Sequence, residues 1–157
     1  MDINTLSGMT ACFSKAGLAI GSTPAQVAIA APNGAGVDFG IDGKAYHKAD
    51  SASSALTAQV NQAPLTTCLY LVCLNASGTV SSVKGEEVAN ADVPNIGVQY
   101  PDVPVGVCPI GAIKVTTSAT AGGYTQGTTS LAAANVTDNY IDFIGGIPGR
   151  PEITLAT

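Results

Sequence analysis

The feature that most constrains the fold is an uninterrupted apolar run at residues 68–74, CLYLVCL. Successive side chains of a strand point to opposite faces, so this run would place apolar side chains on both faces. A strand that is apolar on both faces is typical of one buried between two layers. The sequence therefore predicts a core strand at residues 68–74 that is covered on both sides.

Two hairpins are predicted in the middle of the chain. The core strand runs into the turn-forming residues 75–78 (NASG) and then into a half-polar run at residues 79–83, which should pair back antiparallel. Upstream, residues 37–41 and 44–48 flank the dipeptide Asp42-Gly43. A two-residue Asp-Gly loop is a strong hairpin signal, because its turn needs two positive φ angles.

Two more strands are expected in the second half of the chain. In residues 110–117, apolar and other side chains alternate so that one face of the strand would be wet, that is, exposed to solvent. In residues 140–144 this alternation is partial and ends at Gly145-Gly146. Residues 147–157 then carry two prolines and read as an extended tail. Short helices are conceivable at residues 24–31 and 51–60, although neither segment shows a clear 3.6-residue apolar stripe.

These signals favour an all-β fold, either an antiparallel β-sandwich or a jelly-roll-like barrel, with short or no helices and extended terminal arms. We expect one domain, because a chain of 157 residues is long enough for a single core. The expected division is an N-terminal arm at residues 1–26, a β-sandwich domain at 27–144 and a C-terminal extended tail at 145–157.

Charge and hydropathy exclude two classes of partner. Lys and Arg number six, are scattered, and leave a net charge of −5, whereas a nucleic-acid binder needs clustered cations. The uncharged stretches 16–37 and 51–83 contain Pro, Asn, Gln or hydroxyl residues, so no membrane span is expected. The start Met1-Asp2 lacks the positive charges of an export signal, so we expect no such signal and a protein that is made in the cytoplasm.

The four cysteines predict neither a metal site nor a disulfide framework. No Cys-x-x-Cys spacing occurs. Cys68 and Cys73 are five positions apart, and an odd difference in position places them on opposite faces of a strand. Buried free thiols are therefore expected. The acid pairs Glu86-Glu87 and Asp138 with Asp142 have no His or Cys spaced to complete a metal shell, so we expect no metal and no cofactor.

Catalytic signals are weak. The single histidine, His47, lies beside Lys48 in a predicted strand, and no nucleophile motif such as Gly-x-Ser-x-Gly occurs. The run GAGVDFG at residues 34–40 departs from a dinucleotide fingerprint in its spacing and precedes a hairpin rather than a helix. The run GGYTQG at residues 122–127 is more simply a loop anchored by Tyr124 than an anion cradle. We expect no enzyme.

Three successive segments carry a resemblance: residues 38–50 (DFGIDGKAYHKAD), 68–88 and 108–143. Their succession, over roughly residues 27–144, resembles a recurring class of small tailed-bacteriophage virion proteins that includes capsid decoration, or cement, proteins. The matching positions are residues 42–46 (DGKAY), 109–111 (PIG), 127–129 (GTT) with Leu131, and 136–137 (VT). The resemblance implies a place on the outer capsid surface of the virion, and it carries over no catalytic residue.

A decoration protein would clamp adjacent subunits of the major capsid protein by non-covalent burial and strand pairing. With eight aromatic residues and no Trp, the monomer core is weak, so a homo-oligomer, either a dimer or a trimer, is expected. The candidate contact residues lie in the flanks and are Ile3, Leu6, Met9, Phe13, Ile147, Ile153 and Leu155. The alternative, weighed almost equally, is that these residues cover the protein's own sandwich.

Two other functions remain open from the sequence. A head- or tail-fibre-associated adhesion domain that binds host surface carbohydrate is the main alternative, although such sites usually present aromatic platforms and this chain has five Tyr and no Trp. A small hydrolase is the other, because folding can bring distant catalytic residues together.

Overall fold

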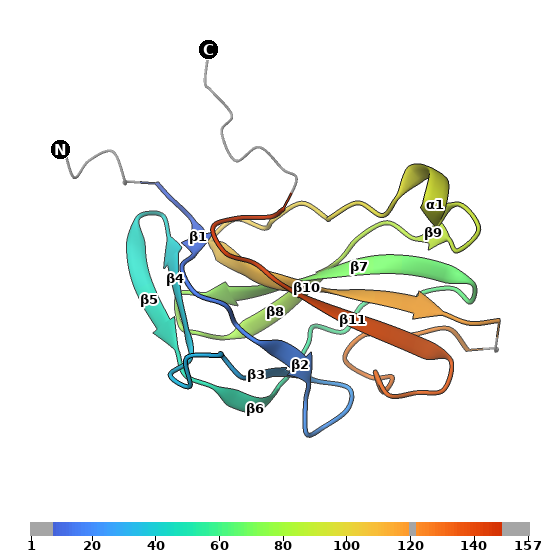
Figure 1. The fold of residues 1–157 in the computed structure, drawn as a ribbon, viewed down its shortest axis with the longest axis horizontal. Coiled ribbons are helices and arrows are strands. Elements are labelled where there is room, and N and C mark those ends of the chain that lie inside the picture. The colour runs from blue at the N-terminus through green and yellow to red at the C-terminus, as the bar shows by residue number, and fades with distance from the viewer. Residues whose placement is uncertain (1–7, 120–121, 149–157) are drawn as a thin grey trace, which may run out of the picture.

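The computed structural model describes residues 8–119 and 122–148, and it is nearly all β (Figure 1). The strands form three antiparallel sheets, and α1 (Val93–Ile96) is the one helix among these residues. The predicted all-β antiparallel fold is confirmed and is consistent with a β-sandwich, whereas a jelly-roll connectivity stays a prediction. None of the described residues forms a helix long and apolar enough to cross a membrane.

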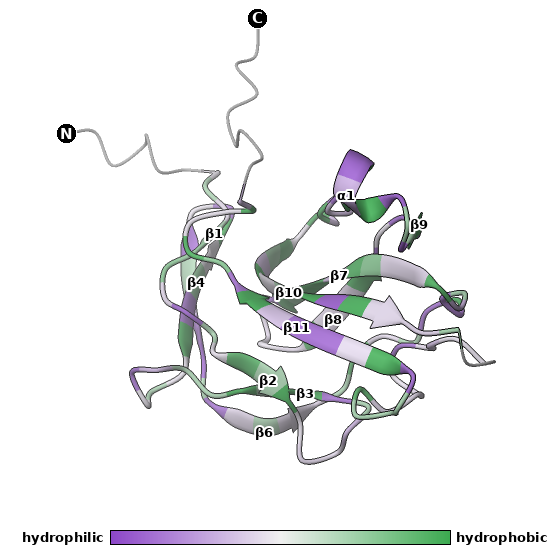
Figure 2. Cartoon of the chain, turned by 45° about the vertical axis from the view of Figure 1, so that its right-hand side comes forward, coloured by the Kyte–Doolittle hydropathy of each residue, from purple (hydrophilic) through white to green (hydrophobic). Residues whose placement is uncertain are grey.

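The central sheet has the order β11–β10–β7–β8, with β9 also paired to β7. Its strands are β7 (Thr66–Asn75), β8 (Val80–Lys84), β9 (Val88–Ala89), β10 (Val107–Thr117) and β11 (Val136–Asp142). Every residue of β7 from 67 to 74 is buried. Figure 2 shows hydrophobic colouring along β7 and mixed hydropathy along β11, as expected for an inner and an outer strand.

Strand β7 separates two cores, as the apolar run at residues 68–74 predicts. The larger core takes the side chains of Cys68, Tyr70, Val72 and Leu74. The second core takes those of Leu69, Leu71 and Cys73, together with Phe143 and Ile147 from the segment after β11. The alternation of faces therefore sets which cysteine enters which core.

The wet face expected for residues 110–117 is confirmed only in part, because Lys114 and Thr116 are half-buried but Ala112 is buried. Ala112 lies in the second core with 0% exposure, because Val98, Tyr100 and Val103 pack over this face from the irregular segment between α1 and β10. Such a cover cannot be seen in the pattern of β10 itself, because residues distant in the sequence provide it. The central sheet is consequently covered on this face around Ala112, whereas Lys114 and Thr116 stay partly exposed.

Two three-stranded sheets complete the structure. One has the order β1–β4–β5, formed by β1 (Ala11–Cys12), β4 (Val37–Ile41) and β5 (Lys44–Lys48). The other has the order β2–β3–β6, formed by β2 (Leu18–Ile20), β3 (Val27–Ile29) and β6 (Ser51–Ser54). The short helices considered at residues 24–31 and 51–60 are therefore wrong, because these segments pair as β3 and β6 and bury Val27 and Ile29.

Both predicted hairpins are confirmed. Asp42 and Gly43 have φ angles of 49° and 77°, as a type I′ turn between β4 and β5 requires. The turn between β7 and β8 is held by the Asn75 side chain, which accepts hydrogen bonds from the backbone N–H groups of Ser77 and Thr79. Side-chain-to-backbone bonds of this kind are why Asn favours turns.

The folded body begins earlier than the division at residue 27. Strands β1 and β2 lie within residues 1–26, where they pair with β4 and β3. Gly145 forms an isolated antiparallel bridge with Cys12, so the segment after β11 also joins the body. The first and last stretches of the sequence, residues 1–7 and 149–157, lie outside the described residues.

The glycine-rich segment at residues 122–127 is anchored from within. Tyr124 is fully buried, packs edge-on against Tyr70 with ring centroids 5.6 Å apart, and bridges to Gln62 through two backbone hydrogen bonds. A Cβ on Gly123 would lie 2.0 Å from the Gln62 carbonyl oxygen, so only glycine permits this approach. The loop interpretation of this segment fits these contacts.

Candidate docking surface

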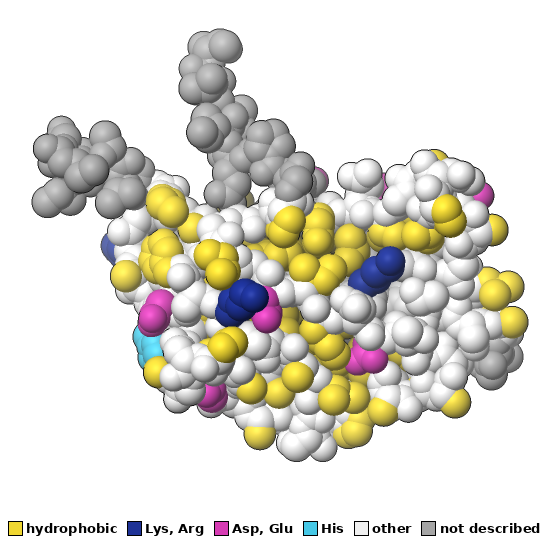
Figure 3. All heavy atoms as spheres, viewed as in Figure 1, with side chains coloured by type: hydrophobic (Ala, Val, Ile, Leu, Met, Phe, Trp, Pro, Cys, Tyr) yellow, Lys and Arg dark blue, Asp and Glu magenta, His cyan; other side chains and the backbone are white. Residues whose placement is uncertain are grey.

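An apolar surface lies at the end of the molecule from which both ends of the described chain leave (Figure 1). We call it the end patch and define it by five residues: Met9, Phe13, Gly40, Ala45 and Ile144. Met9, Phe13 and Ile144 are 42%, 50% and 61% exposed. Figure 3 shows hydrophobic side chains at the surface where the two grey traces depart. Single exposed apolar side chains are common on proteins, but gathered ones mark contact sites.

Phe13 is held on the surface by strand geometry. Its neighbour Cys12 points into the larger core, so Phe13 faces outward, and its N–H donates to the Asp38 carbonyl oxygen at 2.8 Å. The ring lies over Gly40, since a Cβ at that position would be 2.8 Å from Phe13 Cζ. A glycine inside a strand here makes room for an aromatic ring that core packing does not require.

Ile144 lies next to the bridge that joins its segment to β1. The backbones of Cys12 and Gly145 exchange two hydrogen bonds, of 3.0 and 2.7 Å. In an antiparallel ladder, such a bonded pair is followed by a non-bonded pair whose side chains lie close together on one face. The bridge is isolated, and the positions next to it are Phe13 and Ile144, so the alternation of faces puts these two exposed apolar side chains on the same side of the two segments.

The end patch is hollowed. A depression of about 330 Å³ is lined by Met9, Phe13, Gly40, Gly43, Lys44 and Ala45. Two of these lining residues are glycines, which leave the floor low, and Lys44 is the one charged residue in the lining. The depression therefore suits apolar side chains of a partner better than a polar ligand.

Strand β5 presents an open edge next to this depression. In the order β1–β4–β5, the described residues add no further strand to β5. Because the turn has two residues, Ile41 and Lys44 form a hydrogen-bonded pair, and the next pair, Gly40 with Ala45, is non-bonded. The same alternation makes Asp38 and His47 a non-bonded pair. The backbone N–H and C=O groups of Ala45 and His47 consequently point out of the sheet edge.

His47 meets an acid, but on an open surface. Its Nδ1 lies 2.7 Å from Asp38 Oδ1, and the two side chains are 51% and 55% exposed. The Ser14 hydroxyl oxygen accepts a hydrogen bond from the Asp38 backbone N–H, so it is engaged with the backbone. An acid beside a histidine supplies two of the three members of a catalytic triad, but their exposure at opposite positions of a hairpin favours a cross-strand surface pair.

A second, more polar depression of about 450 Å³ lies beside the end of β8. Lys84 in its lining donates to the carbonyl oxygens of Val60 and Asn61 and to the Glu87 carboxylate. Partial burial raises the pKa of Glu87, but hydrogen bonds from Lys84 and the Ala63 N–H outweigh this effect and leave it below its ordinary value. Lys84 therefore ties the segment before β7 to β8.

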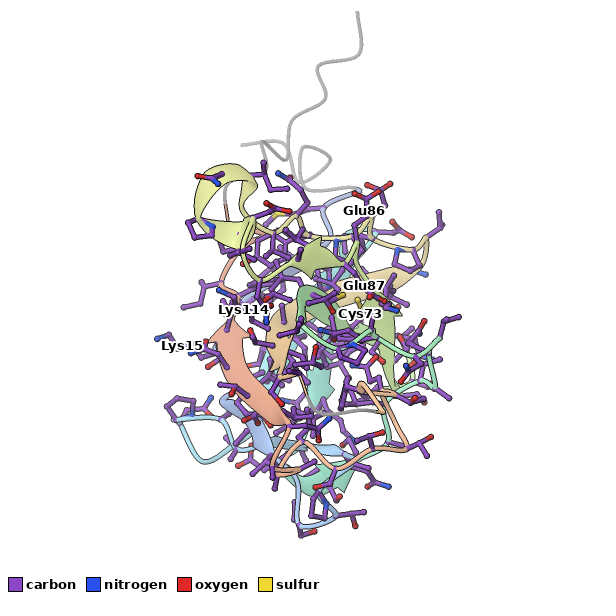
Figure 4. All side chains as sticks on the ribbon, turned by 90° about the vertical axis from the view of Figure 1, so that its right-hand side faces the viewer. Lys15, Cys73, Glu86, Glu87 and Lys114 are labelled. Atoms are coloured by element: carbon purple, nitrogen blue, oxygen red, sulfur yellow. The ribbon has the colours of Figure 1, made fainter. Side chains whose placement is uncertain are left out.

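The acids at this end of β8 lie apart from the lysines on the other side of the molecule. Figure 4 shows Glu86 and Glu87 on one side and Lys15 and Lys114 on the other. Among the described residues, no group of three or more His, Cys, Asp or Glu is placed to hold a metal ion.

The cysteines are buried and free, as predicted. Burial raises the pKa of Cys12 and Cys68 to about 11 and that of Cys73 to about 12, because the interior disfavours the thiolate. Cys68 and Cys73 lie in separate cores, which confirms that they cannot bond to each other. These thiols contribute to packing, and their burial keeps them from acting as nucleophiles.

The candidate contact residues separate into three groups. Met9 and Phe13 are exposed and belong to the end patch. Ile147 is 6% exposed and packs in the second core, so it stabilises the protein's own fold. The remaining four lie outside the described residues and are Ile3, Leu6, Ile153 and Leu155.

The sequence interpretation missed Gly40, Ala45 and Ile144. Ile144 ends the alternating run at residues 140–144, but its place on the same side as Phe13 depends on the bridge between Cys12 and Gly145. The available signal for Gly40 was a glycine inside a predicted strand, which often marks close approach of another group.

Comparisons with protein-family models, curated proteins and solved structures found no match.

Proposed function

We propose that the protein is a bacteriophage capsid decoration protein that binds the major capsid protein shell non-covalently at the outer surface of the virion and stabilises it. The observation that carries this proposal is the end patch, where Met9, Phe13 and Ile144 are exposed around a depression at the end from which both described chain ends leave.

The chemistry of the surface supports attachment to a large protein partner. Charged residues are 11% of the chain, compared with about a quarter in a typical soluble domain. Burying one large apolar side chain contributes about 1.5–3 kcal/mol, so three of them supply a modest contact. A modest contact suffices for a homo-oligomer on a repetitive shell, because linked copies bind with greater avidity than one copy.

The proposed role involves no reaction. The acid and histidine that lie together, Asp38 and His47, are both more than half exposed, and a catalytic pair works better in a site that excludes water. The proposed work of the protein is mechanical: it joins neighbouring capsid subunits against the outward pressure of packaged DNA.

The test is binding to purified capsids assembled without this protein. We expect saturable binding with a fixed ratio of this chain to the capsid protein, measured by co-sedimentation and gel densitometry. Phe13→Ser and Ile144→Ser should each weaken binding at least tenfold, because each removes a large side chain from the end patch. Decorated capsids should also release their DNA at a higher temperature than bare ones.

Val60→Ser is the matched control. Val60 is 80% exposed and lies outside the end patch, on the segment before β7, so its loss should leave binding unchanged. Equal weakening by all three substitutions, or no saturable binding by the wild-type protein, would contradict the proposal.

A second candidate is adhesion to host carbohydrate as part of a head or tail fibre, and the polar depression favours it. Its lining includes the acids Glu86 and Asp102, the amide of Gln99 and the ring of Tyr100. Acids, amides and an aromatic face are the groups that sugar hydroxyls and sugar rings contact. Glycan-array binding that Glu86→Gln and Tyr100→Ala abolish, with no loss in Phe13→Ser, would select this function over decoration.

A further inference from the structure

We propose that residues 152–156 of one copy add as a strand to the open edge of β5 in a second copy and thereby form the homo-oligomer. This inference rests on the proposed function only for the expectation that the protein is oligomeric. It names the segment that is donated, the strand that accepts it and the face that is covered.

The acceptor is prepared for strand addition. The outward N–H and C=O groups of Ala45 and His47 are free of β4, because both residues lie in non-bonded pairs. The three central residues of β5 are exposed or half-buried. An extended segment that pairs with this edge would gain main-chain hydrogen bonds, which is the usual source of affinity in strand addition.

In the donor segment, residues 152–156, large apolar side chains occur at every second position, as in a strand with one apolar face. Residues 152–156 read Glu-Ile-Thr-Leu-Ala, so Ile153 and Leu155 share one face of an extended strand. On β5, Ala45 faces the end patch, and strand alternation puts the side chains of Lys44 and Lys48 on the other face, although Lys44, next to the turn, also lines the depression. A register that lays Ile153 and Leu155 beside Ala45 extends the apolar end patch.

The same register places charges together. Because side chains alternate, Glu152 then lies on the face of Lys44 and Lys48. These two lysines also disfavour pairing of β5 with the β5 of another copy, since like charges would lie opposite each other. Strand β5 should therefore pair poorly with the β5 of another copy and better with a strand that carries an acidic residue.

The tail is long enough to reach a β5 edge. Gly145 pairs with β1 on the side away from β4, so a strand added beyond β5 lies four strand spacings from it, about 19 Å. From Gly145 to Glu152 the chain spans at most about 25 Å. Cross-linking of mixed copies therefore distinguishes a strand from a second copy, as proposed, from a strand of the same copy.

The first experiment measures the oligomeric state of the full chain by sedimentation velocity over a range of concentrations, with no capsid present. We expect the wild type to associate and the double variant Ile153→Ser, Leu155→Ser to remain monomeric. Ala45→Pro should also be monomeric, because it removes an outward N–H at the edge without removing a bond to β4. Circular dichroism and thermal unfolding verify that Ala45→Pro still folds.

The second experiment identifies the contact by cross-linking. Copies with Ala45→Cys are mixed with copies carrying Ile153→Cys or Leu155→Cys and oxidised mildly, and a disulfide-linked heterodimer is expected. The native cysteines are buried and do not interfere. Copies with Val60→Cys, an exposed position away from β5, are the control and should cross-link at least tenfold less.

A wild-type monomer at all concentrations, or equal cross-linking through Ala45→Cys and Val60→Cys, would overturn strand addition. Unchanged association in the double tail variant would do the same. Neither result affects capsid binding, which is measured separately by co-sedimentation, and failure to bind capsids would leave this contact between copies intact.

Discussion

At the scale of single residues, Gly40 has more influence on the surface than its size suggests. It does not need a positive φ, so alanine is compatible with its backbone, but the new Cβ would lie 2.8 Å from Phe13 Cζ. The exposed ring must move, whereas the core need not. We expect Gly40→Ala to weaken capsid binding by about three- to tenfold and to change the melting temperature by less than about 2 °C. Co-sedimentation and thermal unfolding measure the two effects.

A double-mutant cycle controls this prediction. In a Phe13→Ala background the ring is absent, so adding Gly40→Ala should have no further effect on binding. If Gly40→Ala weakened binding equally with and without the Phe13 ring, the substitution would be acting through the backbone of β4 and not through the end patch.

The buried thiols predict how stability depends on pH. The thiols of Cys12, Cys68 and Cys73 ionise near 9.0 when unfolded, but burial raises their pKa values to about 11, 11 and 12 in the folded protein. Above about pH 9 the unfolded chain therefore binds fewer protons, and the free energy of unfolding should fall by up to about 1.4 kcal/mol per pH unit for each thiol. Below the unfolded pKa this contribution is fully present.

Urea unfolding in the presence of a reductant at about pH 8 and pH 10 measures the fall. Cys73→Ala is the control, because it removes one titrating group and should make the fall shallower than in the wild type. Equal stability of the wild type at both pH values would show that the thiols ionise without unfolding.

At the scale of elements, the hairpin of β4 and β5 depends on its two-residue turn. Gly43 has a φ of 77°, which a β-branched residue adopts at a cost of about 1–2 kcal/mol, whereas asparagine tolerates this region. We therefore expect Gly43→Val to lower the free energy of unfolding by about 1–2 kcal/mol and Gly43→Asn to lower it much less. Urea unfolding compares the two variants, and similar losses in both would refute the turn argument.

The elements that local sequence signals define were predictable. The apolar run at residues 68–74 indicated a doubly buried strand, and Asp42-Gly43 indicated a hairpin, because both signals lie within the element itself. Strands β3 and β6 were not predictable, since two short segments of three and four residues acquire their structure by pairing with each other.

The candidate site was predictable only in part, for a related reason. The apolar character of Met9 and Phe13 in a flank suggested contact residues, and both are exposed. Ile147 has the same character but lies in the second core, because burial depends on where the chain turns after Gly145. The place of Ile144 depends on backbone pairing between Gly145 and Cys12, which are distant in the sequence, so the residues around Ile144 do not predict it.

At the scale of the whole molecule, the two proposed contacts belong to one end. The end patch, the β5 edge and the point where the described chain ends leave are adjacent in the β1–β4–β5 sheet and its bridge to Gly145. A copy that receives a tail strand at β5 would enlarge the apolar surface it presents to the shell. Assembly and attachment would then reinforce each other.

The character of the end patch also predicts how attachment responds to salt. Met9, Phe13 and Ile144 are uncharged, and Lys44 is the one charge in the lining of the depression. Ionic screening weakens contacts between exposed charges but leaves apolar burial intact. Binding to capsids should therefore change by less than about threefold between 0.05 and 0.5 M NaCl. Calorimetry should give a negative heat-capacity change, the mark of buried apolar surface. A loss of affinity greater than tenfold over this range would instead indicate attachment through charged groups, and the end patch would not be the surface that binds the shell.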